Sequence, residues 1–299
     1  MPEPAHVPAD LPRLAPRERD TSKRDYGRVV VVGGSSGMAG APALAAMAAL
    51  ASGAGLVELA VPESVVTIAA GFDPCVMTRG FPAEPDGMFA ASAGASVRMR
   101  VAAADAVAIG PGIGRSPAVT TLVHDLWHDL PQPAVFDADA LYALAALDAA
   151  RLASHAGPRI LTPHAGEMLR LLGADPADTR GRDRPWLEAQ AADLARAIDA
   201  VIVLKGPGTL VVGGSRHAHN ETGNPGMATG GTGDVLTGVI AALLAQGLAS
   251  FDAARLGTWV HGRAGDLAAH DLGEISMTAR GLLDRLNRAW RDATAPRSS

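Results

Sequence analysis

The sequence predicts a single α/β domain in which a doubly wound, mostly parallel sheet is covered by helices on both faces. Short apolar runs alternate with helical segments along most of the chain. Several of the runs are apolar without interruption, as expected of strands buried on both faces, and several lead directly into glycine turns. This alternation is typical of a parallel sheet with helical crossovers.

The domain boundaries follow from composition. No linker rich in Pro, Gly or Ser divides the chain, and no internal repeat is found. We expect one catalytic domain over residues 28–292. A flexible leader at 1–27, polar, Pro-rich and charged with both signs, would precede it, and a tail at 293–299 would follow.

The first predicted elements are strands on either side of a helix. Residues 28–32 form an apolar run, a Gly/Ser loop follows, and the Ala- and Leu-rich residues 42–52 favour a helix. Residues 56–61 are the next strand, and 75–78 is a short candidate strand.

The middle of the chain continues the same alternation. Its first strand ends in a Gly-Pro-Gly-Ile-Gly turn, and its last strand runs into Thr-Pro-His. The expected elements, in order, are strand 104–109, helix 117–130, strand 134–136, helix 140–146, strand 159–161 and helix 166–172.

The last third begins with a polar stretch and ends in helices. Residues 175–184 are expected to be a surface loop. An amphipathic helix, a strand, an antiparallel strand pair around Gly213-Gly214 and three helices should follow. Their ranges are 186–197, 200–204, 209–212 with 216–219, and then 232–246, 251–271 and 278–291.

Composition excludes several classes of function. The formal net charge is −5, no basic stripe occurs, and two Tyr and four Trp offer little material for stacking bases, which argues against a nucleic-acid binder. Cys75 is the only cysteine, so no internal disulfide can form. This fits a reducing cytoplasm, where we expect the protein.

The uncharged stretch between Arg28 and Glu58 is long enough to suggest a membrane span. It contains many glycines together with Pro42, and these residues favour a strand, a loop, a helix and a second strand packed inside a domain. The leader does not resemble a signal peptide either.

The most informative motif is Asn-Pro-Gly-Met-Ala-Thr-Gly-Gly-Thr-Gly-Asp-Val-Leu at 224–236, where an apolar helix is expected to start. The unpaired amides and the dipole of a helix start attract anions, and glycines allow phosphate to approach closely. Asp234 can be an ordinary helix cap. Alternatively, it accepts a proton from a hydroxyl that attacks phosphorus. The chain lacks a Walker lysine motif, so a P-loop enzyme is excluded.

Lys205-Gly-Pro-Gly-Thr209 lies between two predicted strands. It can be a simple hairpin turn with a solvated lysine. In the functional interpretation, Lys205 and Thr209 bind the phosphate or ribose of a nucleotide while the glycines let the backbone approach.

Two further motifs stand where strands end, which is where a parallel sheet opens its ligand crevice. His164, in Thr-Pro-His-Ala-Gly-Glu, can be a structural cap, or it can contact a substrate hydroxyl or phosphate. Asp137 and Asp139 suit Mg²⁺ with waters and phosphate, although we expect Asp139 simply to cap the helix that follows. The glycine turn at 110–114 and Gly40-Ala41 can serve either close ligand approach or packing.

Taken together, these motifs resemble the ADP-dependent NAD(P)H-hydrate dehydratases, a ribokinase-like family, over residues 26–287. The resemblance implies a ribokinase-like three-layer α/β/α fold. It is carried by eight motifs in order: Val-Val-Gly-Gly-Ser (31–35), Gly-Ala-Pro-Ala-Leu-Ala (40–45), Ser-Gly-Ala-Gly-Leu-Val (52–57), Ile-Gly-Pro-Gly-Ile-Gly (109–114), Asp-Ala-Asp-Ala-Leu (137–141), Leu-Thr-Pro-His-Ala-Gly-Glu (161–167), Leu-Lys-Gly-Pro-Gly-Thr (204–209) and the loop at 224–236. One departure is Ser22-Lys23-Arg24, where family members often have His-Lys-Gly.

The resemblance also implies roles for individual residues. The hydrated nicotinamide nucleotide would contact Ala41, Gly112, His164 and Asp234, with Asp234 as the catalytic base. The adenine nucleotide would be held by residues of two loops: Lys205, Gly206, Pro207, Gly208, Thr209, Gly231, Thr232 and Gly233. No residue is assigned as a metal ligand.

The implied reaction is the dehydration of the S epimer of NADH or NADPH hydrate through a phosphorylated intermediate, with ADP or ATP as co-substrate and Mg²⁺ as cofactor. The resemblance also implies a homotetramer. A leader of 27 residues is too short for the epimerase domain that some members carry, so we expect a separate NAD(P)H-hydrate epimerase as functional partner.

Two other functions fit the motifs. A small-molecule kinase for a vitamin precursor or a sugar would release its phosphorylated product, whereas the dehydratase would return NAD(P)H and free phosphate. A non-catalytic nucleotide sensor is the third reading. Asp234 argues against it, because binding alone gains nothing from a carboxylate beside a phosphate.

Overall fold

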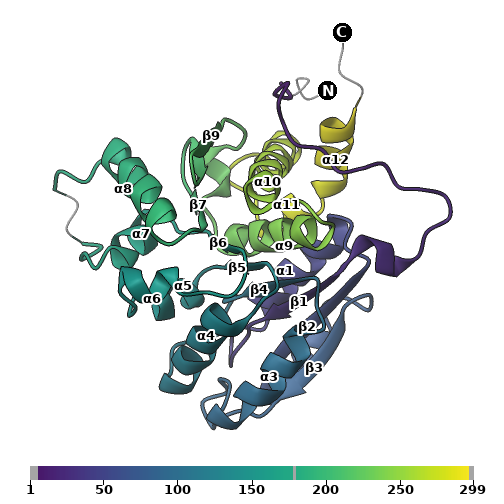
Figure 1. Cartoon of the computed structure of the whole chain (residues 1–299). Coiled ribbons are helices and arrows are strands. Elements are labelled where there is room, and N and C mark those ends of the chain that lie inside the picture. The colour runs from purple at the N-terminus through teal and green to yellow at the C-terminus, as the bar shows by residue number, and fades with distance from the viewer. Residues whose placement is uncertain (1–5, 178–179, 296–299) are drawn as a thin grey trace.

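In the part of the chain that the structure describes, nine strands form one sheet in the order β3-β2-β1-β4-β5-β6-β7-β8-β9 (Figure 1). The computed structural model describes residues 6–177 and 180–295. The strands are β1 Arg28–Val32, β2 Leu56–Pro62, β3 Met77–Phe81, β4 Ala106–Ile109, β5 Ala134–Phe136, β6 Arg159–Leu161, β7 Val201–Leu204, β8 Thr209–Gly213 and β9 Arg216–Asn220. In this spatial order, the strands from β3 at one edge to β7 all pair in parallel. Strand β8 pairs antiparallel with both β7 and β9.

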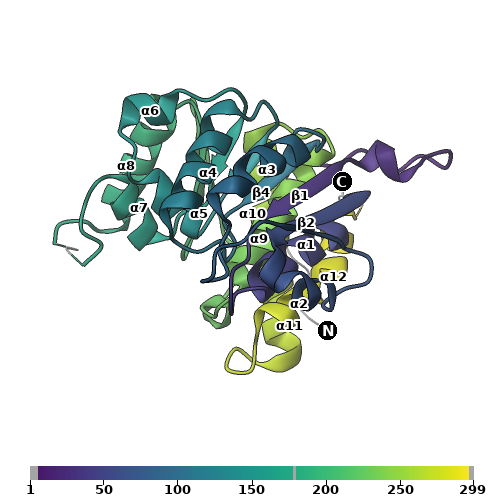
Figure 2. The ribbon, with the colours of Figure 1, turned by 90° about the horizontal axis from the view of Figure 1, so that it is seen from below.

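Two layers of helices cover the sheet, which confirms the predicted three-layer arrangement (Figure 2). The helices packed with one face are α1 Gly40–Ala51, α2 Val66–Ala70, α9 Thr232–Ala245, α10 Ser250–Leu272, α11 Ala279–Leu283 and α12 Leu286–Thr294. Those packed with the other face are α3 Gly94–Val101, α4 Pro117–Asp129, α5 Asp139–Leu144, α6 Ala149–Ala153, α7 Ala165–Leu171 and α8 Arg184–Ala197.

The apolar strand runs explain this layering. In β1, Val29 and Val31 pack into one apolar cluster, and Val30 and Val32 pack into the other. All four side chains are fully buried, because successive residues of a strand point to opposite faces and both faces are covered.

Several helices begin at a side-chain cap, whereas α9 does not. Ser116, Asp183 and Thr278 cap α4, α8 and α11 by accepting a backbone N–H. Helix α9 starts after Gly231, whose φ of 93° suits glycine, and no side chain caps it. Its first-turn amides therefore remain available for another acceptor.

The observed elements differ from the predicted ones in three respects, two of which concern helices and one a strand. The helix predicted at 278–291 is two helices, α11 and α12, because the amide of Arg285 bonds to Leu282 O, an i−3 turn that interrupts the i−4 ladder. The short helices α2, α3 and α6 were not predicted. The strand expected at 75–78 lies at Met77–Phe81, in register with β2.

The predicted surface loop at 175–184 is described except for residues 178–179, which lie outside the described residues. Its described part is mostly exposed and has no helix or strand before α8 begins at Arg184. Residues 1–5 and 296–299 of the predicted leader and tail also lie outside the described residues.

The described part of the leader, residues 6–27, packs on the domain. Leu11 is buried in the cluster formed by α9 and α10, and Arg255 donates a hydrogen bond to the carbonyl of Asp10. A short 3-10 helix at Lys23–Tyr26 follows, with Ser22 as its cap. Within 6–177 and 180–295, no helix is both long enough and apolar enough to cross a membrane.

Candidate active site

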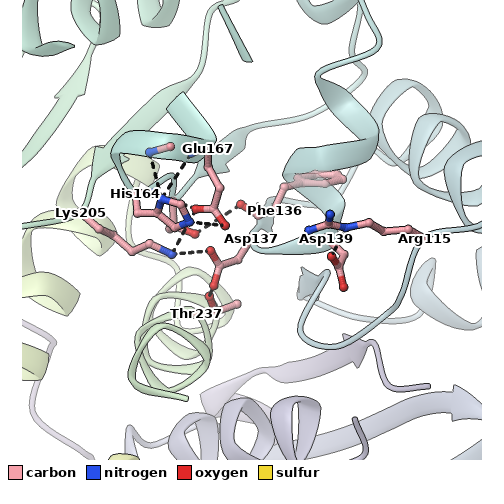
Figure 3. Close-up of polar contacts among 10 residues, drawn as sticks. Arg115, Phe136, Asp137, Asp139, His164, Glu167, Lys205 and Thr237 are labelled. Atoms are coloured by element: carbon pink, nitrogen blue, oxygen red, sulfur yellow. Dashed lines mark hydrogen bonds and ion pairs between the residues drawn. The ribbon is translucent and has the colours of Figure 1, made fainter. Parts of the chain in front are cut away.

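The predicted functional loops meet at the carboxyl edge of the sheet. Strands β4, β5 and β6 are neighbours, β7 follows β6, and each strand leads into one of the motifs. Figure 3 shows Asp137, His164, Glu167 and Lys205 lying together, with Thr237 of α9 below them. The sheet thus brings together side chains that are up to 100 positions apart in sequence.

An ion pair between Asp137 and Lys205 stands at the centre of this group. The Lys205 ammonium lies 2.8 Å from Asp137 Oδ1 and 3.8 Å from Glu167 Oε2. Burial opposes both charges, but each stabilises the other. The pair therefore raises the pKa of Lys205 and holds the pKa of Asp137 below its ordinary value. Both groups are charged at neutral pH, and Lys205 is not the solvated lysine of a simple turn.

Thr237 completes the environment of Asp137. Its hydroxyl donates a 2.8 Å hydrogen bond to Asp137 Oδ2, and both residues are buried. Thr237 follows Asp234 by three positions, so both lie on one face of α9. A threonine within an apolar helix gives no functional signal in sequence, and this contact was not predicted.

Asp234 lies in the first turn of α9, two residues after the start of the helix at Thr232. Burial, reinforced by the negative charge of Asp137, raises the pKa of Asp234 to about 7, although Lys205 opposes the shift. A carboxylate with such a pKa can accept a proton near neutral pH and release it again.

Gly233, the neighbour of Asp234 in sequence, lies close to the ion pair. A Cβ atom at Gly233 would lie 3.3 Å from Lys205 Nζ and 3.6 Å from Asp137 Oδ2. The start of α9 therefore approaches the Lys205 ammonium at Gly233, one of the predicted anion-binding residues.

A buried histidine fixes this helix start. His261 of α10 lies 2.8 Å through Nε2 from the carbonyl of Thr232, and burial lowers the pKa of His261 to about 4. The ring is neutral at physiological pH, and Nε2 must carry the proton because a carbonyl only accepts. His261 was not predicted, since it lies within a long amphipathic helix without a motif.

The segment Lys205-Gly206-Pro207-Gly208-Thr209 is the turn between antiparallel β7 and β8, as the simpler interpretation expected. Gly206, Pro207 and Gly208 are exposed. The Arg184 guanidinium, which was not predicted here, donates to the carbonyls of Leu204, Lys205 and Gly208. Arg184 therefore fixes the backbone of the turn, while Gly206, Pro207 and Gly208 remain exposed to solvent.

His164 is the cap of α7. Its Nδ1 accepts the amides of Gly166 and Glu167, and the Glu167 carboxylate accepts the amide of His164. Because Nδ1 accepts, the ring proton is on Nε2, which lies 3.4 Å from Glu167 Oε1 in a mostly exposed side chain. His164 is therefore a structural cap, as one of the two interpretations expected. Its Nε2 nitrogen lies beside Glu167, a residue of the site.

The expectation that Asp139 caps a helix is wrong. Helix α5 begins at Asp139 itself, and its N-cap is Ala138 in an uncommon conformation with a φ of 52°. The Asp139 carboxylate instead accepts the amide of Gly114 and pairs with Arg115, at 2.7 Å from its Nε (Figure 3). It links the turn after β4 to the turn after β5.

Ala41 and Gly112 lie against each other at the other side of the site. A Cβ atom at Gly112 would lie 3.2 Å from the Cβ of Ala41 and 2.7 Å from Met38 O. Helix α1, which carries Ala41, packs along α9 so closely that a Cβ at Gly238 would lie 1.9 Å from Ala45 O. The two predicted substrate residues are thus joined to the helix of Asp234.

Metal binding by side chains alone is not supported. Among the described residues, no group of three or more His, Cys, Asp or Glu side chains could hold a metal ion. Asp137 and Asp139 already have cationic partners.

Comparisons with known proteins identify the family of the chain. A family model described as NAD(P)H-hydrate dehydratase matches residues 29–288. The chain is 48% identical over 279 residues to the bifunctional NAD(P)H-hydrate repair enzyme Nnr of Moorella thermoacetica, a match that covers 93% of this chain and 51% of that protein. The chain spans about half the length of the curated bifunctional relatives it matches.

A relative of similar length and a solved structure extend the comparison. The ADP-dependent (S)-NAD(P)H-hydrate dehydratase of Neisseria meningitidis is 37% identical, over 91% of this chain and 90% of that protein. A structure of the ADP/ATP-dependent NAD(P)H-hydrate dehydratase of Bacillus subtilis, co-crystallised with ATP and Mg²⁺, has a TM-score of 0.75 at 28% identity and covers 93% of this chain and 94% of that one. The predicted ribokinase-like α/β fold is confirmed.

Proposed function

The chain belongs to the NAD(P)H-hydrate dehydratase family, and we propose that it removes water from the S epimer of NADH or NADPH hydrate at the expense of ADP or ATP. The observation that carries this proposal is Asp234, whose pKa is raised to about 7 at an uncapped helix start beside the Asp137–Lys205 pair.

The difficult step is the loss of a poor leaving group. The hydrate carries a hydroxyl at C6 of its reduced nicotinamide ring, and hydroxide leaves slowly near neutral pH. Asp234 would accept the hydroxyl proton as the oxygen attacks the terminal phosphorus of the nucleotide, so that an O–P bond forms while the donor P–O bond breaks. The amides of Gly231–Gly233 would stabilise the charge on the transferred group.

The second step restores the ring. The lone pair of the ring nitrogen expels phosphate from C6, and loss of a proton from C5 to water re-forms the double bond. The products are NAD(P)H, phosphate and AMP when ADP is the donor. The site needs no separate acid for this step, because phosphate leaves readily.

The two ligands would occupy opposite sides of the ion pair. We assign the hydrated ring to Ala41, Gly112, His164 and Asp234. The adenine nucleotide is assigned to the open turn from Lys205 to Thr209 and to Gly231–Gly233. Support comes from the position of Lys205, whose ammonium lies next to both Gly233 and Asp137.

The residues present fit a Mg²⁺ ion that arrives on the nucleotide. Such an ion takes most ligands from phosphate and water and only one or two from protein, which agrees with the absence of a larger acidic cluster among the described residues. Of the two carboxylates beside Lys205, Asp137 is bound by the ammonium at 2.8 Å, so Glu167, at 3.8 Å, would hold the ion. Bound Mg²⁺ would neutralise charge on the donor phosphates.

The wider organisation is also part of the proposal. We propose a single catalytic domain over residues 28–292, a homotetramer, a cytoplasmic location, and a separate NAD(P)H-hydrate epimerase that supplies the S epimer. The N. meningitidis relative, with its similar length, supports ADP as the donor.

The test is recovery of absorbance at the reduced-nicotinamide band when hydrated NADH is mixed with the protein, ADP and Mg²⁺. Recovery with stoichiometric release of phosphate is expected. A phosphorylated product that accumulates without recovery would identify a kinase instead. Failure with both ADP and ATP, while other alcohols are phosphorylated, would overturn the dehydratase assignment.

A further inference from the structure

Three side chains beside the site have no role in the chemistry above. Arg115 and Arg170 both place their guanidinium groups over the ring of Tyr142, with the Cζ atoms 4.2 Å and 5.4 Å from the ring centroid. We call this group the arginine–tyrosine shelf. Tyr142 is 42% exposed and is therefore not a core side chain.

The shelf carries unused charge and unused donors. Arg115 binds Asp139 through Nε, and its two terminal nitrogens have no partner among the described residues. Arg170 pairs with no carboxylate in residues 6–177 and 180–295. A guanidinium presents its donors as a planar fork that suits phosphate, and an aromatic ring holds that plane in place.

The shelf belongs to segments that also carry residues assigned to the substrate. Arg115 directly follows the glycine turn that contains Gly112, Tyr142 is on α5 one turn after Asp139, and Arg170 is on the helix that His164 caps. The shelf is therefore built from the segments that carry Gly112 and His164, two residues assigned to the substrate. The turn at Lys205–Thr209, assigned to the other nucleotide, joins β7 to β8, and β6 separates β7 from the strand that leads into α5.

We propose that Arg115 and Arg170, oriented by Tyr142, form an anion subsite that binds the phosphates of the hydrated dinucleotide. This inference rests on the proposed function, because it extends the same substrate away from Asp234. The reacting ring carries no negative charge that could bind two guanidinium groups. The pyrophosphate and the 2′-phosphate of NADPH do carry such charge.

The variants are Arg170→Gln, Tyr142→Leu and Tyr142→Phe, with Arg151→Gln as the matched control. Arg151 is an exposed arginine on α6 that belongs neither to the shelf nor to the site. The substrates are the hydrates of NADPH, NADH and reduced nicotinamide riboside, the last of which has no phosphate. Loss of a charge-assisted contact should lower kcat/KM for the dinucleotides about tenfold or more in Arg170→Gln, through KM. The KM for ADP should not change.

Tyr142 acts only by positioning, so Tyr142→Phe should behave like the wild type and Tyr142→Leu like the arginine variant. With the riboside, all proteins should be equal. A loss confined to NADPH hydrate assigns the shelf to the 2′-phosphate, and a loss with both dinucleotides assigns it to the pyrophosphate. Unchanged KM for both dinucleotides, or an equal loss with the riboside, overturns the inference.

Calorimetric titration with NADPH separates this inference from the proposed function. If the wild type dehydrates no hydrate but binds NADPH more tightly than Arg170→Gln, the dehydratase proposal fails and the subsite stands. If turnover is normal and NADPH binds equally to both proteins, the subsite fails alone.

Discussion

Replacing Asp234 by Asn should make the protein more stable and almost inactive. The pKa of Asp234 rises from 3.8 to about 7 in the fold, so the folded state disfavours the ionised carboxylate. One pKa unit corresponds to ~1.4 kcal/mol, and the shift therefore amounts to at most about 4 kcal/mol at high pH. Asn matches the shape of the carboxylate without its charge.

The sign of the effect depends on pH. Because the folded protein binds the Asp234 proton more tightly than the unfolded chain, this group contributes stability below pH 4 that is lost as pH rises through about 7. Asp234→Asn does not lose this stability, because Asn does not ionise. Its free energy of unfolding should exceed that of the wild type by roughly 2–4 kcal/mol at pH 8 and by much less at pH 4.5.

Urea denaturation without nucleotide, at both pH values, measures the difference. Asp129→Asn, at an exposed carboxylate at the end of α4, is the control and should leave stability unchanged at both. A variant less stable than the wild type at pH 8, or a difference independent of pH, would show that Asp234 is not held against ionisation.

The catalytic half of the prediction uses the same protein. Removal of a general base lowers rates by about 10²–10⁴-fold, so Asp234→Asn should bind ADP normally and turn over at least about a hundredfold more slowly. In the wild type, kcat/KM should rise with pH up to about 7, as Asp234 of the free enzyme ionises. Near-normal turnover by the variant would refute the base assignment.

Three further substitutions test the nucleotide side. Lys205→Ala should weaken ADP binding about tenfold or more by calorimetry, since a charged donor is lost; unchanged affinity would contradict the assignment. Gly233→Ala places a Cβ 3.3 Å from Lys205 Nζ and should weaken ADP binding with little change in Tm; equal ADP affinity would show that no ligand uses that space. Arg184→Met removes the donor to three carbonyls of the β7–β8 turn and should raise the KM for ADP several-fold while kcat changes less; a change in kcat alone would place its effect elsewhere.

Much of the fold could be predicted because buried strands appear in the sequence as runs of apolar residues. The runs at β1, β5 and β6 match the predicted ranges, because a strand buried on both faces is almost entirely apolar; only the first residues of β1 and β6, Arg28 and Arg159, depart from this pattern. The break between α11 and α12 could not be predicted in this way, because it depends on a single i−3 hydrogen bond at Arg285 and on no special residue.

The site was predictable where a strand end carries a motif and unpredictable where a contact is made only in three dimensions. Asp137 directly follows β5 and Lys205 directly follows β7, and these parallel strands end at the same edge of the sheet. The contact between the two side chains therefore follows from the topology. Thr237, His261 and Arg184 reach the same place from helices, and their local sequences look like those of ordinary amphipathic helices.

The start of α9 has one more implication, which concerns how this site can vary. The side chain assigned to take the proton and the amides assigned to hold the phosphoryl group belong to the same rigid turn, whose position His261 helps to fix. A shift of that turn would displace both at once, so neither can be adjusted alone. Changes in preference among donors or acceptors would therefore have to arise in the surrounding loops, while this one turn stays still.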